Sequence, residues 1–323
     1  MKDLVSRREF LATSSSCAAH IALASVAAPA ALRAAWANAP LGKVAAREAF
    51  GSLERVSDGI WALISTPLTG DRTTLSNGGI IAGRNGVLAI EGFNTPAGAT
   101  WLAARAKELT GRWPTHVALT HYHSDHANGV AGYERPDAKP VIRSTEVTRG
   151  LVLEKNLPAD PARTDALHDV TYFSAAEPTV VDLGGVTVRV VPRSGHTSSD
   201  VSLELDDRNV LFCGDLFWNA MFPNYVDAIP SQLSKSARAL RRGTSVTYVP
   251  GHGALAKQAE FDRYLTMIDE IEAAAKRGHE KGQTAAELGA SYALPPSLGD
   301  WVLFNKGFFE RAFSAWYKEL DTH

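Results

Sequence analysis

Six consecutive residues decide how this sequence is interpreted: His121-Tyr122-His123-Ser124-Asp125-His126. They follow Val117-Ala118-Leu119, an apolar run that predicts a buried strand. Alternate side chains of an extended chain point the same way, so we expect His121 and His123 on one side, before a short helix at Ala127-Asn128-Gly129-Val130. The sequence has 10 histidines in 323 residues, so chance produces this pattern on the order of once in 1,000 to 10,000 sequences. Imidazole and carboxylate groups at this spacing favour a site for zinc or another divalent metal over a solvated polar loop.

Three further residues with metal-binding side chains stand where later apolar runs end. His196 follows Ser194-Gly195, Asp215 follows Cys213-Gly214, and His252 follows Pro250-Gly251. A single histidine or aspartate at such a position is more often a cap or a turn residue than a ligand. Together with the first motif, however, the three complete a set of metal-competent side chains, so we treat them as candidate ligands.

Taken in order, these residues resemble the ligand pattern of the metallo-β-lactamase superfamily, and the resemblance extends from Gly59 to about His252. It implies an α/β fold, a four-layer αβ/βα sandwich in which two sheets lie face to face with helices outside and a dinuclear site at one edge. It also implies the ligands: one metal held by His121, His123 and His196, a second held by Asp125, His126 and His252, and Asp215 as the bridge between them.

The chemistry that this resemblance implies is hydrolysis. Two Zn²⁺ ions, or iron or manganese in their place, would share a hydroxide that attacks a polarised carbonyl group. Asp125 would be the catalytic residue that orients the hydroxide or relays a proton. The expected substrate is a small molecule with an ester, lactone, thioester or β-lactam bond. Dedicated β-lactamases of the superfamily commonly carry cysteine or serine at the position of Asp215, which favours the other bonds.

Two other functions remain open. One is an iron-containing redox enzyme of the same fold, although the diiron flavoprotein branch normally has glutamate where His123 stands. The other is a periplasmic protein that binds metal without catalysis. Metal content and turnover together separate these alternatives from a hydrolase.

Composition excludes several classes of protein. With 45% hydrophobic and 21% charged residues, the chain can bury a large core, which excludes disorder, collagen and coiled coil. The net charge of −2 gives no field that would attract a polyphosphate, so we expect no nucleic-acid partner. The two cysteines, Cys17 and Cys213, provide no disulfide framework.

Residues 1–37 are predicted to be a twin-arginine export signal. The pair Arg7-Arg8 precedes an uncharged stretch from Leu11 to Leu32, and small residues favour cleavage after Ala37. Pro29 and several serines make the stretch too polar for a membrane anchor. We therefore expect a periplasmic or secreted protein with no stable anchor after cleavage, and we leave its oligomeric state open.

Strand-like and helix-like patterns alternate along the rest of the chain in two mirrored halves. We expect a metallo-β-lactamase-like domain at residues 48–275 and a helical C-terminal extension at residues 276–323 that packs on it. One helix is predicted from Pro96 to Leu109, capped by Thr95, and a polar loop at residues 157–169. Residues 65–77 and 216–228 are expected to flank the site, the former as a mobile lid. Aromatic residues of the latter either line a substrate pocket or pack in the core.

Four residues have open or minor roles. The family usually ends the strand before the first helix with an aspartate that supports a metal-bound histidine, and this chain has Glu91 there. Cys213 lies two residues before Asp215 and would face the same way on an extended strand, yet a buried inert thiol is the favoured interpretation. His116 and His168 are predicted to be surface or turn histidines outside the site.

Overall fold

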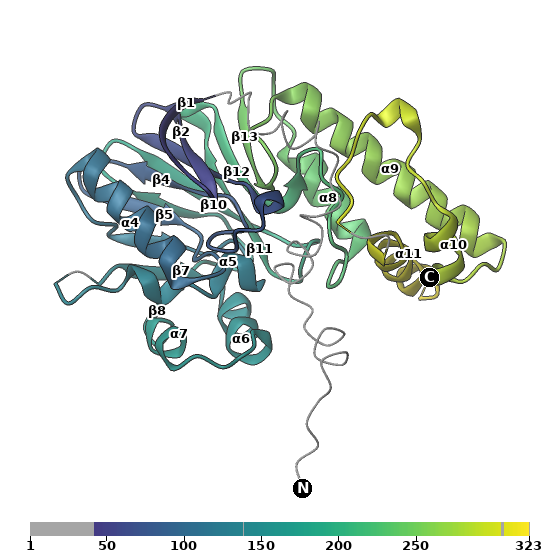
Figure 1. Ribbon diagram of the computed structural model, residues 1–323, viewed down its shortest axis with the longest axis horizontal. Coiled ribbons are helices and arrows are strands. Elements are labelled where there is room, and N and C mark those ends of the chain that lie inside the picture. Colours follow the sequence, from purple (N-terminus) through teal and green to yellow (C-terminus); the bar gives the residue numbers. More distant parts are fainter. Residues whose placement is uncertain (1–41, 138, 305–306, 323) are drawn as a thin grey trace, which may run out of the picture.

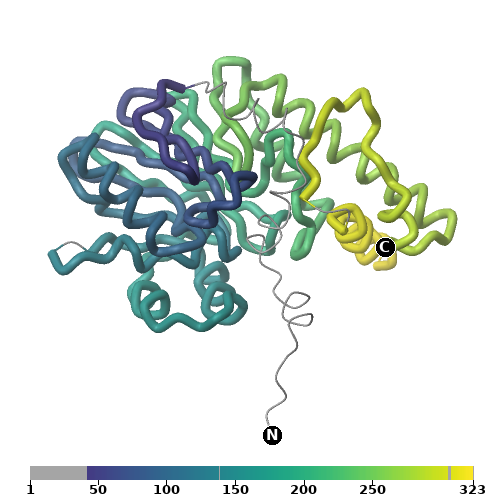
Figure 2. Tube along the Cα trace, in the orientation of Figure 1, coloured from purple at the N-terminus to yellow at the C-terminus, as the bar shows by residue number. Residues whose placement is uncertain are grey.

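The structure is a computed structural model that describes residues 42–137, 139–304 and 307–322. The predicted export signal at residues 1–37 therefore lies outside the described residues. Two β-sheets form the centre of the molecule, and helices lie on their outer sides (Figure 1). The tube in Figure 2 shows that the N-terminal half of the described chain builds one side of the molecule and the C-terminal half builds the other.

The first sheet has eight strands that lie side by side in chain order. Its strands are β1 (Lys43–Glu48), β2 (Gly51–Ser57), β3 (Ile60–Ser65), β4 (Gly78–Ala82), β5 (Val87–Ile90), β6 (His116–Ala118), β7 (Val141–Ser144) and β8 (Val170–Tyr172). Neighbours are antiparallel as far as β5 and parallel from β5 to β8. Parallel neighbours need long crossovers, and helices α4 (Pro96–Thr110), α5 (Ser124–Ala127), α6 (Glu146–Lys155) and α7 (Pro161–Ala166) lie in these crossovers.

The second sheet has five strands in the order β13-β12-β11-β10-β9. They are β9 (Thr179–Asp182), β10 (Thr187–Arg193), β11 (Asp200–Leu205), β12 (Val210–Trp218) and β13 (Thr247–His252). The strands are antiparallel from β9 to β12, and β13 returns parallel to β12 after helix α8 (Pro230–Leu240). Each sheet is therefore an antiparallel meander followed by parallel strands, three parallel pairs in the first sheet and one in the second, which fits the two predicted halves.

Successive side chains of a strand point to opposite faces of its sheet, so each sheet packs against one layer on either face. On β3, Ile60 and Ala62 belong to a core cluster shared with the second sheet, whereas Trp61 and Leu63 belong to the cluster under α4. A third cluster joins the outer side of β12 to α8 and α9 (Gln258–Glu280). The order helix, sheet, sheet, helix confirms the predicted four-layer αβ/βα sandwich.

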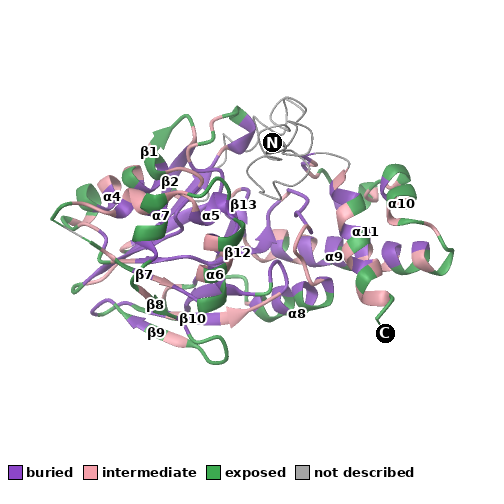
Figure 3. Cartoon of the chain, turned by 90° about the horizontal axis from the view of Figure 1, so that it is seen from below, coloured by how far each residue is buried: buried purple, intermediate pink, exposed green. Residues whose placement is uncertain are grey.

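The C-terminal helices extend the outer helical layer. Helices α10 (Ala285–Ser291) and α11 (Gly307–Leu320) pack against α9, and α11 also contacts α8. In α11, Phe308, Phe313 and Trp316 are buried in the cluster that contains Phe217 and Trp218 of β12. Figure 3 shows exposed positions on α10 and buried ones around α5 and β13. No helix among the described residues is long and apolar enough to span a membrane.

Three local predictions were wrong. The first helix after the histidine motif begins at Ser124, so it carries Asp125 and His126, because the chain turns directly after the extended His123. Thr95 occupies the N-cap of α4 but does not cap it, since its hydroxyl donates to the carbonyl of Thr73 at 3.0 Å. Residues 157–169 are not a simple loop, because Pro161 begins α7 and the side chain of Asp160 accepts a capping bond.

Short 3₁₀ helices complete the described chain. They are η1 (Pro67–Thr69), η2 (Val130–Tyr133), η3 (Asp206–Arg208) and η4 (Pro296–Leu298). The Pro295-Pro296 pair interrupts the C-terminal helices between α10 and α11, where the sequence predicted a break.

Candidate metal centre

The seven predicted ligands come together at one edge of the sandwich. His121 and His123 lie between β6 and α5, and α5 carries Asp125 and His126. The other three are His196 in the turn between β10 and β11, Asp215 on β12 and His252 at the end of β13. Each of the seven is at most 2% exposed. Strand ends from both sheets thus deliver buried polar side chains to one place.

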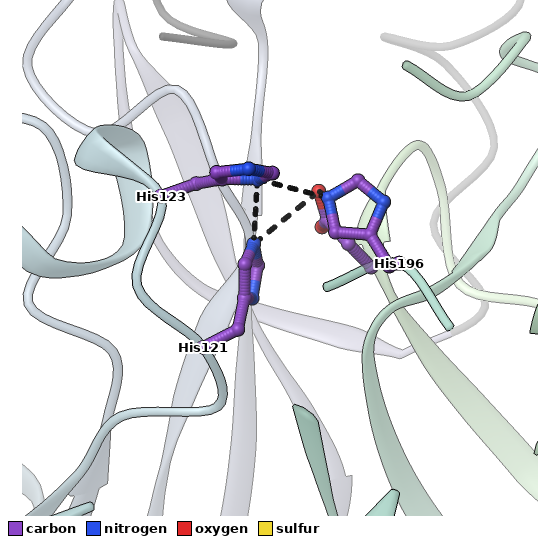
Figure 4. Close-up of side chains that lie close together, drawn as sticks. His121, His123 and His196 are labelled. Carbon is purple, nitrogen blue, oxygen red and sulfur yellow. Dashed lines mark hydrogen bonds and ion pairs between the residues drawn. The ribbon is translucent and has the colours of Figure 1, made fainter. Parts of the chain in front are cut away.

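The first group contains three histidines that point toward one another (Figure 4), together with Asp215. Nδ1 of His123 lies 3.1 Å from Nε2 of His121 and 2.9 Å from Nε2 of His196. Two nitrogen ligands of one tetrahedral zinc lie about 3.3 Å apart. Three imidazole nitrogens in this arrangement can hold one divalent metal.

The second group contains a carboxylate and two histidines. Oδ2 of Asp125 lies 3.3 Å from Nε2 of His252 and 3.7 Å from Nε2 of His126. Trp218 packs against His252 with ring centroids 4.0 Å apart, which fixes one wall of this group. The second group therefore offers ligands of the kind that suits zinc, iron or manganese.

Asp215 stands between the two groups. Its Oδ2 lies 3.1 Å from Nε2 of His196 in the first group, and its Oδ1 lies 3.1 Å from Nε2 of His126 in the second. The Oδ2 atom is also 3.4 Å from Nε2 of His252. One carboxylate thus reaches ligands on both sides, as a residue that bridges two metals must.

The charges and unsatisfied atoms of the site fit two cations. Both carboxylate oxygens of Asp125 and of Asp215 are buried and form no hydrogen bond within the described residues. Burial would lower the pKa of His126, but the carboxylates of Asp215, Glu91 and Asp125 raise it well above its usual value. Buried carboxylates require compensating positive charge. The two groups together therefore fit a dinuclear metal site.

Glu91, whose role the sequence left open, supports one histidine from each group. Its Oε1 accepts a hydrogen bond from Nδ1 of His126 at 3.0 Å, and the hydroxyl of Thr120 donates to the same oxygen. Nδ1 of His121 lies 3.0 Å from the Thr120 hydroxyl oxygen. Because that hydroxyl has a single proton, which goes to Glu91, its oxygen accepts from His121. Both histidines then keep an unprotonated Nε2 toward the metals.

Asp227 is a supporting residue that sequence reasoning missed. Its Oδ2 lies 3.0 Å from Nε2 of His123, which leaves Nδ1 of that ring to face the first group. Burial would raise the pKa of Asp227, but the hydrogen bond and charge of His123 hold it well below its usual range. Asp227 lies 104 positions after His123, so no local spacing links the two.

The loop at residues 65–77, predicted from the sequence as a mobile lid, is attached to the site at its C-terminal end. Asn77 donates from Nδ2 to the carbonyls of Pro250 and Gly253, at 2.9 and 2.8 Å, and so holds the turn that carries His252. The hydroxyl of Ser76 donates to the carbonyl of Asp125 at 2.7 Å. Both residues are buried. This end of the loop supports the site, and the sequence showed only its polarity.

The remaining sequence predictions have simple outcomes. Cys213 belongs to the core cluster shared with α8 and α9, and burial raises the pKa of its thiol well above the usual value, as an inert cysteine requires. We expected the side chain of Cys213 to face the same way as that of Asp215, because side chains alternate along a regular strand. A register shift at Gly214 interrupts this alternation in β12. His116 and His168 belong to neither ligand group of the described residues. The aromatic residues at 217–225 pack in the core.

Gly251 lies against the carboxylate of Asp215. A Cβ atom added at Gly251 would lie 1.9 Å from Oδ1 of Asp215 and 2.8 Å from the backbone carbonyl carbon of Gly214, so the Asp215 carboxylate or the strand would have to move. The close approach of β13 to β12 at this point brings His252 and Asp215 together.

Comparison with known proteins identifies the family of this chain and finds proteins with the same fold. Residues 75–252, more than half of the chain, match the family model described as the metallo-beta-lactamase superfamily. The lactamase-like protein adaB of Aspergillus niger is 27% identical over 54% of this chain, which spans about half of that protein (54%). A hydroxyacylglutathione hydrolase of Acidiphilium cryptum is 29% identical over 69% of this chain and 82% of its own length. The sec-alkylsulfatase Pisa1 of Pseudomonas sp. superposes with a TM-score of 0.67 at 14% identity, over 84% of this chain and 51% of its own.

Proposed function

Because this chain belongs to the metallo-β-lactamase superfamily, we propose that it is an exported hydrolase that uses two zinc ions to cleave a carbonyl bond of a small molecule. The candidate bonds are those of an ester, a lactone, a thioester or a β-lactam. The observation that carries the proposal is the position of Asp215, whose two oxygens lie 3.1 Å from ligands of both groups. The relatives named as hydroxyacylglutathione hydrolases support hydrolysis.

The chain's own residues have distinct tasks in this mechanism. When bound, two cations supply a hydroxide nucleophile at neutral pH and polarise the scissile carbonyl. Asp125 is placed to orient the attacking water and to accept its proton, because its buried oxygens have no hydrogen-bond partner within the described part of the chain. The same carboxyl group then returns the proton to the leaving group. Glu91 and Asp227 hold three of the histidines in fixed orientations.

Export is a separate part of the proposal. It rests on the arginine pair Arg7-Arg8 and the uncharged stretch that follows it. Twin-arginine cargo is exported folded, so the metals would be inserted in the cytoplasm and the enzyme would act in the periplasm or outside the cell. Its partner is a small-molecule substrate, and we propose no nucleic-acid partner and no stable membrane anchor. Cell fractionation of the full chain and of an Arg7→Lys, Arg8→Lys variant tests this, because the variant should stay in the cytoplasm.

The experiment that tests the catalytic proposal combines metal analysis with turnover. Protein purified without added metal is analysed for zinc, iron and manganese, and the same preparation is assayed with a chromogenic β-lactam, a lactone, an aryl ester and a thioester. Two zinc ions per chain and turnover of one bond class are expected. Iron without hydrolysis would instead indicate the redox function, and bound metal without any turnover would indicate a binding protein.

A further inference from the structure

Four of the seven candidate ligands lie in one short stretch, residues 121–128, which we call the ligand segment. It contains α5, and α6 and α7 lie close to it in two perpendicular views (Figure 1 and Figure 3). Helix α7 also contacts η2, which follows the ligand segment. Glu91 and Asp227 orient imidazole rings of this segment, whereas the contacts from α6 and α7 reach its backbone and its last residue.

A buried arginine of α7 is at the centre of these contacts. Arg163 is 4% exposed. Its Nη1 donates to Oδ1 of Asn128 at 3.0 Å, and its Nη2 donates to the carbonyls of Asn156 and Pro158 at 2.6 and 2.9 Å. All three acceptors are neutral oxygens, which offset only part of the cost of burying a charge. A guanidinium suits this position because its rigid planar fork holds several oxygens in one geometry.

One arm of this network reaches the backbone between two ligands. Nδ2 of Asn156 donates to the carbonyl of Tyr122 at 2.7 Å, and both residues are buried. That carbonyl belongs to the peptide bond that joins Tyr122 to His123. Asn156 in turn offers its own carbonyl to Nη2 of Arg163. Arg163 therefore holds Asn156, and Asn156 holds the backbone that leads into His123.

The other arm holds the end of α5. Asn128 follows directly after this helix, and its backbone nitrogen donates to the carbonyl of Ser124 at 2.9 Å. Its side chain accepts the hydrogen bond from Nη1 of Arg163. Asp125 and His126 lie in the four-residue helix between these points. Because a helix this short is not stable on its own, its position depends on contacts with the rest of the fold.

We propose that Arg163 is a positioning residue of the metal centre, since it holds the ligand segment at two points. Through Asn156 it sets the backbone between His121 and His123, which are ligands of the first group. Through Asn128 it sets the helix that carries the ligands of the second group. The proposal rests on metal binding in the proposed function and does not depend on which bond is cleaved. It predicts that loss of the guanidinium weakens both metals together.

The first test compares metal binding by the full chain and by two variants. Arg163→Gln removes the fork, and Arg163→Lys keeps the charge on a single ammonium group. Leu102→Ala is the matched control, because Leu102 is buried in the core cluster that also contains Ala166 of α7 and cannot form hydrogen bonds. We expect the affinity for both metals, measured by competition with a fluorescent chelator, to fall about tenfold in both Arg163 variants and to stay unchanged in the control.

Three results of this competition would overturn the proposal. They are full affinity in Arg163→Gln, full affinity in Arg163→Lys, and an equal loss in Leu102→Ala, which would show that any destabilised core weakens the metals. Melting temperatures show whether each variant is folded. Asn156→Ala keeps the guanidinium and removes only the bond to Tyr122, so it tests one arm if Arg163→Gln does not fold. In that variant, the first metal should bind about tenfold more weakly, and an unchanged affinity would contradict the proposal.

The second test needs no metal. Hydrogen exchange of the metal-free proteins is followed by mass spectrometry in peptides that cover the ligand segment. The amides of His126, Ala127 and Asn128 are hydrogen-bonded within this segment, so their exchange measures how often it opens. We expect exchange there to be about tenfold faster in Arg163→Gln and unchanged in Leu102→Ala, and equal rates in both variants would refute the positioning role. If the unmodified chain binds no metal, the proposed function fails, while these rates still decide whether Arg163 holds the ligand segment.

Discussion

The two ligand groups of the candidate metal centre differ in charge more than in shape. In the first group, burial lowers the pKa of His121 well below its usual value and also lowers that of His123. In the second, burial acts the same way, but the surrounding carboxylates raise the pKa of His126, and they raise that of His252 to about 9. Without metal, His121 and His123 of the first group thus favour the neutral imidazole, whereas His126 and His252 of the second group hold protons.

This difference has a physical cause and a consequence. Asp125 belongs to the second group, and Glu91 contacts its His126 directly, whereas the first group reaches Glu91 only through Thr120 and has Asp227 beside His123. Carboxylates close to an imidazole stabilise its protonated form, and they stabilise a metal ion in its place. The second group therefore binds its cation with more electrostatic attraction, and binding there must displace protons.

Removal of the shared residue should have the largest effect because it breaks both groups together. In an Asp215→Ala variant we expect both metals to bind weakly and turnover to fall by about a thousandfold or more. Metal analysis after gel filtration and the turnover assay measure this. The melting temperature of the metal-free protein is the control, and it should change little because a buried carboxylate is removed with its desolvation cost. Full activity in this variant would rule out a bridging role.

Glu91→Gln tests whether one residue couples the two groups. It removes the negative charge that orients His126 directly and His121 through Thr120, so affinity for both metals should fall by about ten- to a hundredfold. Competition with a fluorescent chelator measures each affinity. Glu177→Gln, at an exposed position, is the matched control. If only one metal is affected, the relay through Thr120 does not operate.

Asp227→Asn should affect the first group alone. The hydrogen bond at 3.0 Å to His123 loses its charge, and we expect the first metal to bind about tenfold more weakly. The affinity of the second metal, measured in the same competition experiment, is the internal control. Equal loss from both groups would show that Asp227 acts on the fold and not on His123.

The smallest effect is a difference in pH dependence between the two metals. Because the pKa of His252 is about 9 in the metal-free protein, its proton must leave before a metal binds, and affinity of the second group falls as the pH decreases from about 8 to about 6. Burial lowers the pKa values of His121 and His123 in the first group, so these two imidazoles have no proton to lose over this range. Metal content measured after dialysis at each pH checks this, and simultaneous loss of both metals would contradict it.

Much of the fold could be predicted because it depends on local patterns. The succession of strand-like and helix-like patterns predicted the two mirrored halves, and the spacing of apolar residues predicted the helix that begins at Pro96. The short helix α5 was misplaced, since its start depends on the turn after His123. Helix α7 was missed, because its capping residue Asp160 lies in a segment whose composition is typical of loops.

The sequence by itself determined which side chains are available as ligands and where they stand on strand ends, because residue chemistry and strand alternation are local properties. Only the tertiary structure decided how they are held: Glu91 between His121 and His126, Asn77 on the turn at Gly251, and Asp227 on His123. These contacts join segments that are distant in sequence, and their geometry depends on how the two sheets and α11 pack against one another.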